Sequence, residues 1–187
     1  MNSEQDSELM LAYAGGDMKA FESLYSRHKR SLYQFMLNSC GNEALTHELY
    51  QDVWLRVVNK RSSYTQDAPF NAWLYRIARN RLIDHFRQHA VADSQLMYMD
   101  EEHSPIATLD NRQLSPDEVA SLSQRSDALT AAMQKLPPAQ REAILLRHIA
   151  GMSIKEVAEF VNEGTETVKS RLRYAVTKIR SQLKELA

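Results

Sequence analysis

The stretch TVKSRLRYAVTKIRSQLKELA, residues 167–187, gives the clearest structural signal in the C-terminal part of this chain. Its apolar residues recur at steps of three and four, so they share one stripe of an α-helix and leave the basic residues outside that stripe. The apolar positions are Val168, Leu172, Val176, Ile179, Leu183 and Leu186, and the basic ones are Lys169, Arg171, Arg173, Lys178, Arg180 and Lys184. The pattern predicts a long amphipathic helix with a basic face.

A second, shorter helix is expected directly before it, over residues 153–161. Ser153 and Glu156 have the spacing of a capping box, and Asn162-Glu163-Gly164 predicts a turn. A short helix, a tight turn and a long basic helix make a helix-turn-helix, which reads duplex DNA with its second helix. The residues expected to contact DNA on that helix are Glu166, Thr167, Lys169, Ser170, Arg171, Arg173, Tyr174 and Lys178. Among these, Arg173 is the candidate for a guanine contact, and the lysines and Arg171 suit phosphates.

The rest of the chain also predicts helices. It has only five glycines and lacks the alternation typical of strands, so we expect an all-α fold of two small helical domains. The first domain is predicted over residues 1–90 and the second, helix-turn-helix domain over residues 115–187. Residues 91–114 between them show no clear period and carry the run Asp100-Glu101-Glu102, which predicts a flexible acidic linker.

The helix predicted over residues 70–89 offers a second surface for nucleic acid. Arginine and asparagine side chains fall near one line of this helix, and aromatic residues gather at its start. Unpaired bases need such groups: rings for stacking, amides for hydrogen bonds and cations for the backbone. The candidate residues are Tyr64, Phe70, Asn71, Trp73, Arg76, Arg79, Asn80 and Arg87. The alternative is that Phe70 and Trp73 belong to the core.

Composition and motifs exclude several classes of function. With a net charge of −1 the whole molecule is not a polycation, and its single cysteine, Cys40, cannot form an intrachain disulfide. No apolar run is long enough to cross a membrane, and the N-terminus lacks the basic start of a signal peptide, so we expect a cytoplasmic protein without membrane insertion. No assembled catalytic, metal-ligating or phosphate-cradling motif is found. We therefore expect neither an enzyme, a metal nor a cofactor.

Four segments in order resemble a known family. FNAWLYRIARNRLIDHFR (70–87), preceded by LYQDVWLRV (49–57), resembles the second conserved region of bacterial sigma factors. MSIKEVAEF (152–160) and TETVKSRLRYAVTKIRSQL (165–183) resemble the fourth region. The presence of these two regions alone is typical of the extracytoplasmic-function group. The resemblance implies a subunit that directs core RNA polymerase to promoter DNA, with the fourth region on the duplex upstream element and the second region on unpaired bases downstream. It also implies an anti-sigma protein as a partner.

The resemblance further implies that the helix over residues 43–60 docks on the polymerase clamp. The residues expected to do so are His47, Glu48, Gln51, Asp52 and Leu55.

Two departures from the family pattern matter. Glu166 stands where glycine is typical, which favours a contact with a cytosine edge over one with a phosphate. On the docking helix an acidic stretch is missing two carboxylates, which weakens electrostatic docking. One hypothesis is that a Ser/Thr kinase restores the charge at Ser62, Ser63 or Thr65. Its alternative is that Glu48 and Asp52 suffice.

A function of another class is also compatible with the helix-turn-helix. A stand-alone transcriptional regulator would bind duplex operator DNA as a dimer, with its N-terminal domain dimerising or sensing a ligand. Such a protein should protect two half-sites about one helical turn apart without polymerase. A sigma factor should protect two dissimilar elements only together with core polymerase.

Overall fold

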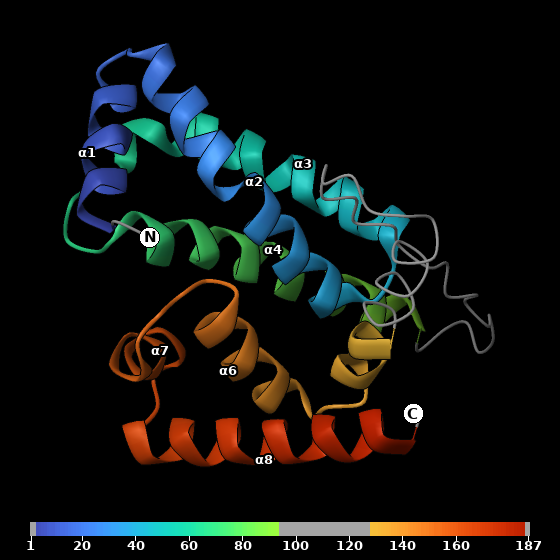
Figure 1. Ribbon diagram of the computed structural model, residues 1–187. Helices are drawn as coiled ribbons and strands as arrows, with labels where there is room; N and C mark the ends of the chain where they lie inside the picture. Colours follow the sequence, from blue (N-terminus) through green and yellow to red (C-terminus); the bar gives the residue numbers. More distant parts are fainter. Residues whose placement is uncertain (1–2, 94–127, 186–187) are drawn as a thin grey trace, which may run out of the picture.

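A computed structural model of the chain describes residues 3–93 and 128–185, and every regular element in these ranges is helical, as predicted. The first domain contains four α-helices and one 3₁₀ turn. They are α1 (Ser3–Ala14), α2 (Met18–Cys40), α3 (Glu43–Lys60), η1 (Arg61–Ser63) and α4 (Phe70–Asp93). Figure 1 shows α2, α3 and α4 running side by side with α1 across one end.

The described part of the second domain begins with a helical segment over residues 128–134. It continues with α6 (Pro138–His148), α7 (Ile154–Val161) and α8 (Thr165–Glu185). The predicted linker, residues 91–114, lies outside the described residues except for 91–93, which extend α4 beyond the predicted end of the first domain. Residues 115–127 of the predicted second domain also lie outside them.

Local sequence signals account for several helix ends. Asp17 accepts a hydrogen bond from Lys19 N at 2.9 Å and begins α2. Gly41 ends that helix with a φ of 74°, a left-handed conformation that glycine adopts without strain. Ser153 and Glu156 form the predicted capping box of α7, with both reciprocal hydrogen bonds present.

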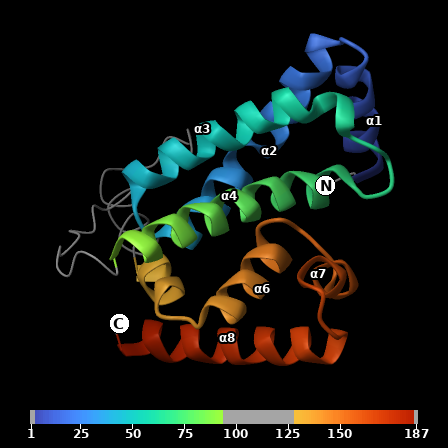
Figure 2. The same cartoon turned by 180° about the vertical axis from the view of Figure 1, so that it is seen from behind.

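The two domains contact each other and share one connected apolar core. Phe35 of α2 and Met152 before α7 are both almost fully buried and belong to the same cluster of core residues. The domains meet along α2 and α6 and along α4 and α7. In Figures 1 and 2, α4 lies between the α2–α3 pair and the second domain, whereas α8 lies on the outer side of that domain.

A buried polar contact fixes α1 to the rest of the first domain. The Asp6 carboxylate is 2.8 Å from His28 Nε2, and Arg27 donates to its other oxygen at 2.8 Å. His28 is fully buried and its ring packs edge-on against Phe70. Burial lowers the pKa of His28 below 6.5, although Asp6 acts in the opposite direction. The imidazole is therefore neutral in the folded protein near neutral pH.

This burial makes the stability of the fold depend on pH. An unfolded chain takes up a proton on His28 near pH 6.5, before the folded chain does, so acidification favours unfolding. The stabilisation is present above that pH and is lost as the pH falls through it. We expect the melting temperature to fall between about pH 7.5 and pH 5.5, and the slope to be shallower in His28→Gln, which cannot titrate. His148→Gln, an exposed histidine on α6, is the control; equal slopes in all three proteins would contradict the prediction.

Candidate nucleic-acid interface

The helix-turn-helix is formed by α7 and α8. Asn162 ends α7 in the left-handed conformation with a φ of 55°, and α8 begins at Thr165 after Gly164. Val168, Ala175 and Ile179 are buried against the rest of the second domain. The opposite side of α8 therefore faces solvent. The apolar stripe of the sequence therefore determines which side of α8 can meet DNA.

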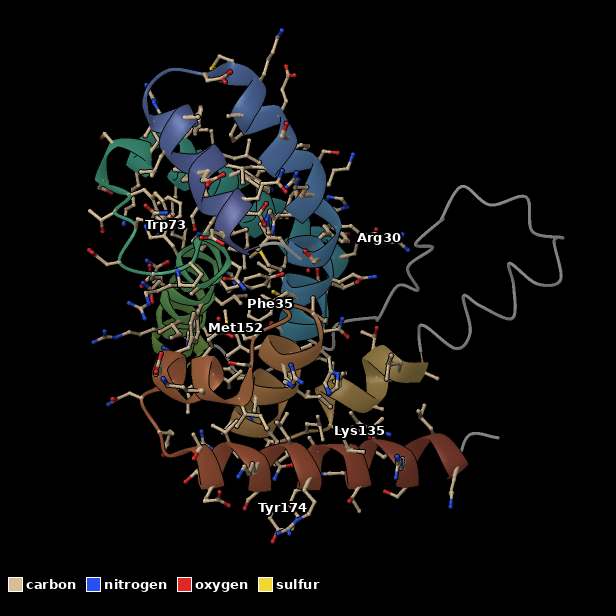
Figure 3. All side chains as sticks on the ribbon, turned by 60° about the vertical axis from the view of Figure 1, so that its left-hand side comes forward. Arg30, Phe35, Trp73, Lys135, Met152 and Tyr174 are labelled. Carbon is tan, nitrogen blue, oxygen red and sulfur yellow. The ribbon has the colours of Figure 1, made fainter. Side chains whose placement is uncertain are left out.

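The predicted contact residues of α8 lie on or beside its solvent side. Arg173 and Tyr174 are both exposed, and the Arg173 guanidinium lies 5.2 Å from the centre of the Tyr174 ring. Figure 3 shows Tyr174 pointing away from the protein body. Glu166, Thr167, Lys169 and Lys178 are exposed as well, and Ser170 and Arg171 are half-buried. The arrangement can present a cation and a ring to a groove of duplex DNA.

Two of the predicted cations on α8 have acidic partners within the chain. Lys169 Nζ is 2.6 Å from Glu166 Oε1, and Arg171 Nη2 is 2.6 Å from Glu163 Oε1. Exposed ion pairs of this kind contribute only about 0–1 kcal/mol. A phosphate can therefore replace either carboxylate at little cost, while the pairs hold the cations in place beforehand.

On the first domain, part of the predicted strand-binding set lines a pocket between α3 and α4. Its volume is about 180 Å³. The lining residues are Arg56, Lys60, Ser63, Trp73, Arg76, Ile77 and Asn80. The pocket thus combines an indole ring, an amide, a hydroxyl and three cations. The sequence pattern alone does not point to Arg56 and Lys60, although they stand four residues apart on α3, because their position beside α4 follows only from helix packing.

Two predicted contact residues belong to the core instead. Tyr64 is 5% exposed and Phe70 is fully buried. Their rings contact each other, and the Tyr64 ring also meets Trp73 edge-on with 5.3 Å between ring centres. They cannot stack on a base from these positions, so the expectation that they contact DNA is corrected. Trp73, by contrast, is half-buried and lines the pocket.

Two more predicted residues face the second domain. Asn71 Nδ2 donates to Ala150 O at 3.4 Å, and Arg79 forms a two-pronged ion pair with Glu142 of α6. The Arg76 guanidinium is exposed but lies 5.8 Å from the centre of the Phe160 ring in α7. Arg87 is exposed farther along α4. The predicted single-strand surface is therefore split between an open pocket and a part that the second domain covers.

The predicted polymerase-docking residues share one exposed face of α3. Leu55 is 59% exposed, which is high for a leucine, and His47, Glu48 and Gln51 are exposed beside it. Arg81 of α4 donates to Asp52 at 2.6 Å and lies 3.7 Å from Glu48. The Arg81 side chain itself is only 12% exposed, so it contacts these carboxylates from the buried side of the docking face. Sequence analysis missed Arg81, because its partners are 29 residues or more away in the chain.

Other candidate chemistry finds no support in the described residues. Within 3–93 and 128–185 no three His, Cys, Asp or Glu side chains are grouped so that they could hold a metal ion. Burial raises the pKa of the Cys40 thiol to about 11, so this thiol stays protonated at neutral pH. None of the described helices has the length and hydropathy needed to cross a bilayer.

Comparison with known families and proteins agrees with the two-domain organisation. Residues 24–91 match the family described as Sigma-70 region 2, and residues 126–179 match Sigma-70, region 4. The chain is 30% identical to the ECF RNA polymerase sigma factor SigW of Bacillus subtilis over 179 residues, covering 91% of this chain and 92% of SigW. It is 26% identical to the ECF RNA polymerase sigma factor BldN of Streptomyces coelicolor over 183 residues, covering 97% of this chain and 67% of BldN.

Solved structures share the fold. CnrH, in its complex with the cytosolic domain of CnrY, aligns with a TM-score of 0.69 at 24% identity, covering 98% of this chain and 99% of CnrH. The sigma factor RpoE of Bartonella quintana, in complex with the anti-sigma factor NepR, aligns with a TM-score of 0.70 at 23% identity, covering 89% of this chain and 98% of RpoE. Together, the two matched regions and the SigW similarity identify the chain as a member of the ECF group of RNA polymerase sigma factors, which direct transcription initiation and are not enzymes.

Proposed function

We propose that this sigma factor uses three separate surfaces to start transcription. The exposed face of α3 docks on core RNA polymerase, α8 binds the duplex upstream promoter element, and the pocket between α3 and α4 holds an unpaired base of the downstream element. The observation that carries the proposal is the pocket, because it unites an aromatic wall, an amide and cations beside the helix of the matched region 2. These groups are the ones that recognise single-stranded bases.

Promoter opening then follows from binding energy. Taking a base out of the duplex costs a few kcal/mol, which a protein offsets by stacking and hydrogen bonds in a pocket. Trp73 supplies the stacking surface and Asn80 the amide, while Arg56, Lys60 and Arg76 favour the adjacent phosphates. No covalent step is required of the chain, in keeping with the family.

At the upstream element, α8 enters the major groove with the N-terminal half of its solvent side. Arg173 is fit for a bidentate contact with guanine, and Tyr174 next to it limits where the guanidinium can lie. Glu166, at the start of the helix, can accept from the amino group of cytosine when Lys169 turns to a phosphate. The specificity would then come from Glu166 and Arg173, and the affinity from the flanking cations.

The proposed partners are core RNA polymerase, promoter DNA and an anti-sigma protein, and the proposed location is the cytoplasm, where the first two meet. CnrH and RpoE were solved with CnrY and NepR bound, which supports an anti-sigma partner here. A stand-alone dimeric regulator is not favoured, because residues 24–91 of the first domain match Sigma-70 region 2, a region of polymerase-associated proteins.

The upstream contact is tested with Arg173→Ala. The promoter is first selected from genomic fragments by run-off transcription with purified core polymerase. Loss of one bidentate base contact should weaken holoenzyme binding by about 1–3 kcal/mol, or roughly 5- to 140-fold, and relax the sequence preference at one upstream position. Lys135→Ala, exposed on the second domain but outside α8, is the charge-matched control. Unchanged protection of the upstream element would count against the assignment.

The docking face is tested with Leu55→Asp. A charge placed at an exposed apolar docking position should lower the affinity for core polymerase by at least about tenfold, and it should leave the melting temperature unchanged. Met18→Asp is a matched control, because Met18 is 61% exposed and lies on α2. Fluorescence titration of labelled protein with core polymerase measures the affinity of both variants. Equal affinities for the two variants would remove Leu55 from the docking face.

We further propose that phosphorylation by a Ser/Thr kinase supports docking, and the structure separates the three candidate positions. Ser62, Ser63 and Thr65 are all exposed, but Ser63 lines the α3–α4 pocket and donates to Lys60 O at 2.8 Å. A phosphate on Ser63 would occupy the cations proposed for DNA, whereas one on Ser62 or Thr65 adds negative charge outside the pocket lining. The hypothesis therefore favours Ser62 and Thr65.

The same titration tests this idea. The double variant Ser62→Glu/Thr65→Glu should bind core polymerase several-fold more tightly than Ser62→Ala/Thr65→Ala, whereas Ser63→Glu should impair promoter opening on the assembled holoenzyme. Identical affinities of the Glu and Ala proteins would mean that Glu48 and Asp52 suffice for docking.

A further inference from the structure

We propose that Glu142 of α6 takes the place of a DNA phosphate on Arg79 and thereby holds the free chain in a closed, inactive arrangement. Arg79 Nε donates to Glu142 Oε1, and Arg79 Nη2 lies 3.5 Å from Glu142 Oε2. The two side chains are 34% and 25% exposed, so the pair is partly shielded from water. The proposal builds on the proposed function, in which this side of α4 binds the unpaired strand.

The chemistry of the pair explains why it blocks DNA. A guanidinium binds a carboxylate and a phosphate with the same fork of N–H donors, so one partner excludes the other. With Glu142 bound, Arg79 has no free fork for the DNA backbone. Arg76, one turn earlier on α4, is engaged in the same direction by the ring of Phe160. The second domain thus engages Arg79 through Glu142 and also contacts Arg76, which lines the strand-binding pocket.

A small set of polar contacts holds the rest of the junction. Gln134 donates to Asn38 O at 2.8 Å, and Arg141 donates to Ser39 O at 3.2 Å, so the second domain satisfies carbonyls at the C-terminal end of α2. Asn71 adds its hydrogen bond to Ala150 O. These polar contacts add to the apolar core that the two domains share, and interfaces between domains generally resemble transient interfaces more than permanent ones.

The junction is also incompletely packed, which favours its opening. A cavity of about 570 Å³ lies beside the ion pair, and both Arg79 and Glu142 line it. Its apolar walls include Ile83 and Phe86, which are 44% and 46% exposed, and Leu145 from the other domain. Because Ile83 and Phe86 remain partly in water, closing the junction at this cavity gains less hydrophobic stabilisation than full burial of these two side chains would give. The ion pair can therefore decide between the closed and the open arrangement.

The closed arrangement is tested on the full chain without DNA or polymerase. Glu142→Gln should increase the radius of gyration measured by small-angle X-ray scattering, because the amide cannot hold the guanidinium by charge. The matched control is Glu159→Gln, an exposed acid on α7 that makes the same change in net charge. The charge swap Arg79→Glu/Glu142→Arg should return the radius to the wild-type value. Circular dichroism melting confirms that each variant is folded.

The phosphate-mimic part is tested with a labelled single-stranded DNA of mixed sequence. If about nine in ten free molecules are closed, opening should raise the apparent affinity about tenfold in Glu142→Gln and not in Glu159→Gln. Asn80→Ala in the Glu142→Gln background should reduce that affinity, because the strand must reach the pocket. A radius of gyration that does not change in Glu142→Gln overturns the proposal that Glu142 holds the chain closed. A larger radius with unchanged DNA affinity overturns the phosphate mimicry.

The failure of this proposal and the failure of the proposed function can be told apart. If the chain failed to support run-off transcription, the proposed function would fall, yet the scattering result would still report whether Glu142 closes the chain. If transcription succeeded and the radius of gyration stayed the same in every variant, only the proposed closure by Glu142 would be overturned.

Discussion

One helix, α4, must serve the core and the nucleic acid at the same time, and this constraint shapes the rest of the molecule. Its apolar side, with Leu74, Tyr75 and Ala78, is fully buried in the first domain. A helix turns 100° per residue, so only the remaining side is left for Arg76, Arg79 and Asn80. The positions of α3 beside it and of α6 and α7 beneath it then decide which of these residues meet solvent, the pocket or another domain.

Much of the fold could be predicted from local sequence patterns. The apolar stripe of α8, the capping box at Ser153 and the glycine that ends α2 each depend on residues within one or two helical turns. The all-helical fold and the two matched regions followed from such signals. The predicted basic side of α8 also lies in solvent, because the same stripe that packs inward determines what points outward.

The parts that the sequence could not predict depend on contacts between distant segments. Periodicity does not show whether an aromatic residue at a helix start faces inward, and Tyr64 and Phe70, both predicted for the strand-binding surface, belong to the core. The pairs formed by Arg79 with Glu142 and by Arg81 with Asp52 join residues 63 and 29 positions apart. Only tertiary packing brings them together, and both change the charge that a surface can offer to a partner.

The corner at Gly41 links the ending of α2 to the seating of the second domain. A Cβ at this position would lie 2.8 Å from Gln134 Cδ, so a side chain here would force the Gln134 side chain to shift. The acceptors at Asn38 and Ser39 exist once α2 is wound, and their donors follow 96 and 102 residues later. During synthesis, domains fold as units from the N-terminus. The acceptors at the end of α2 are therefore in place before the segment that carries their donors emerges from the ribosome. The newly synthesised chain can thus cover part of α4, its strand-binding helix, as soon as the helices of the second domain form.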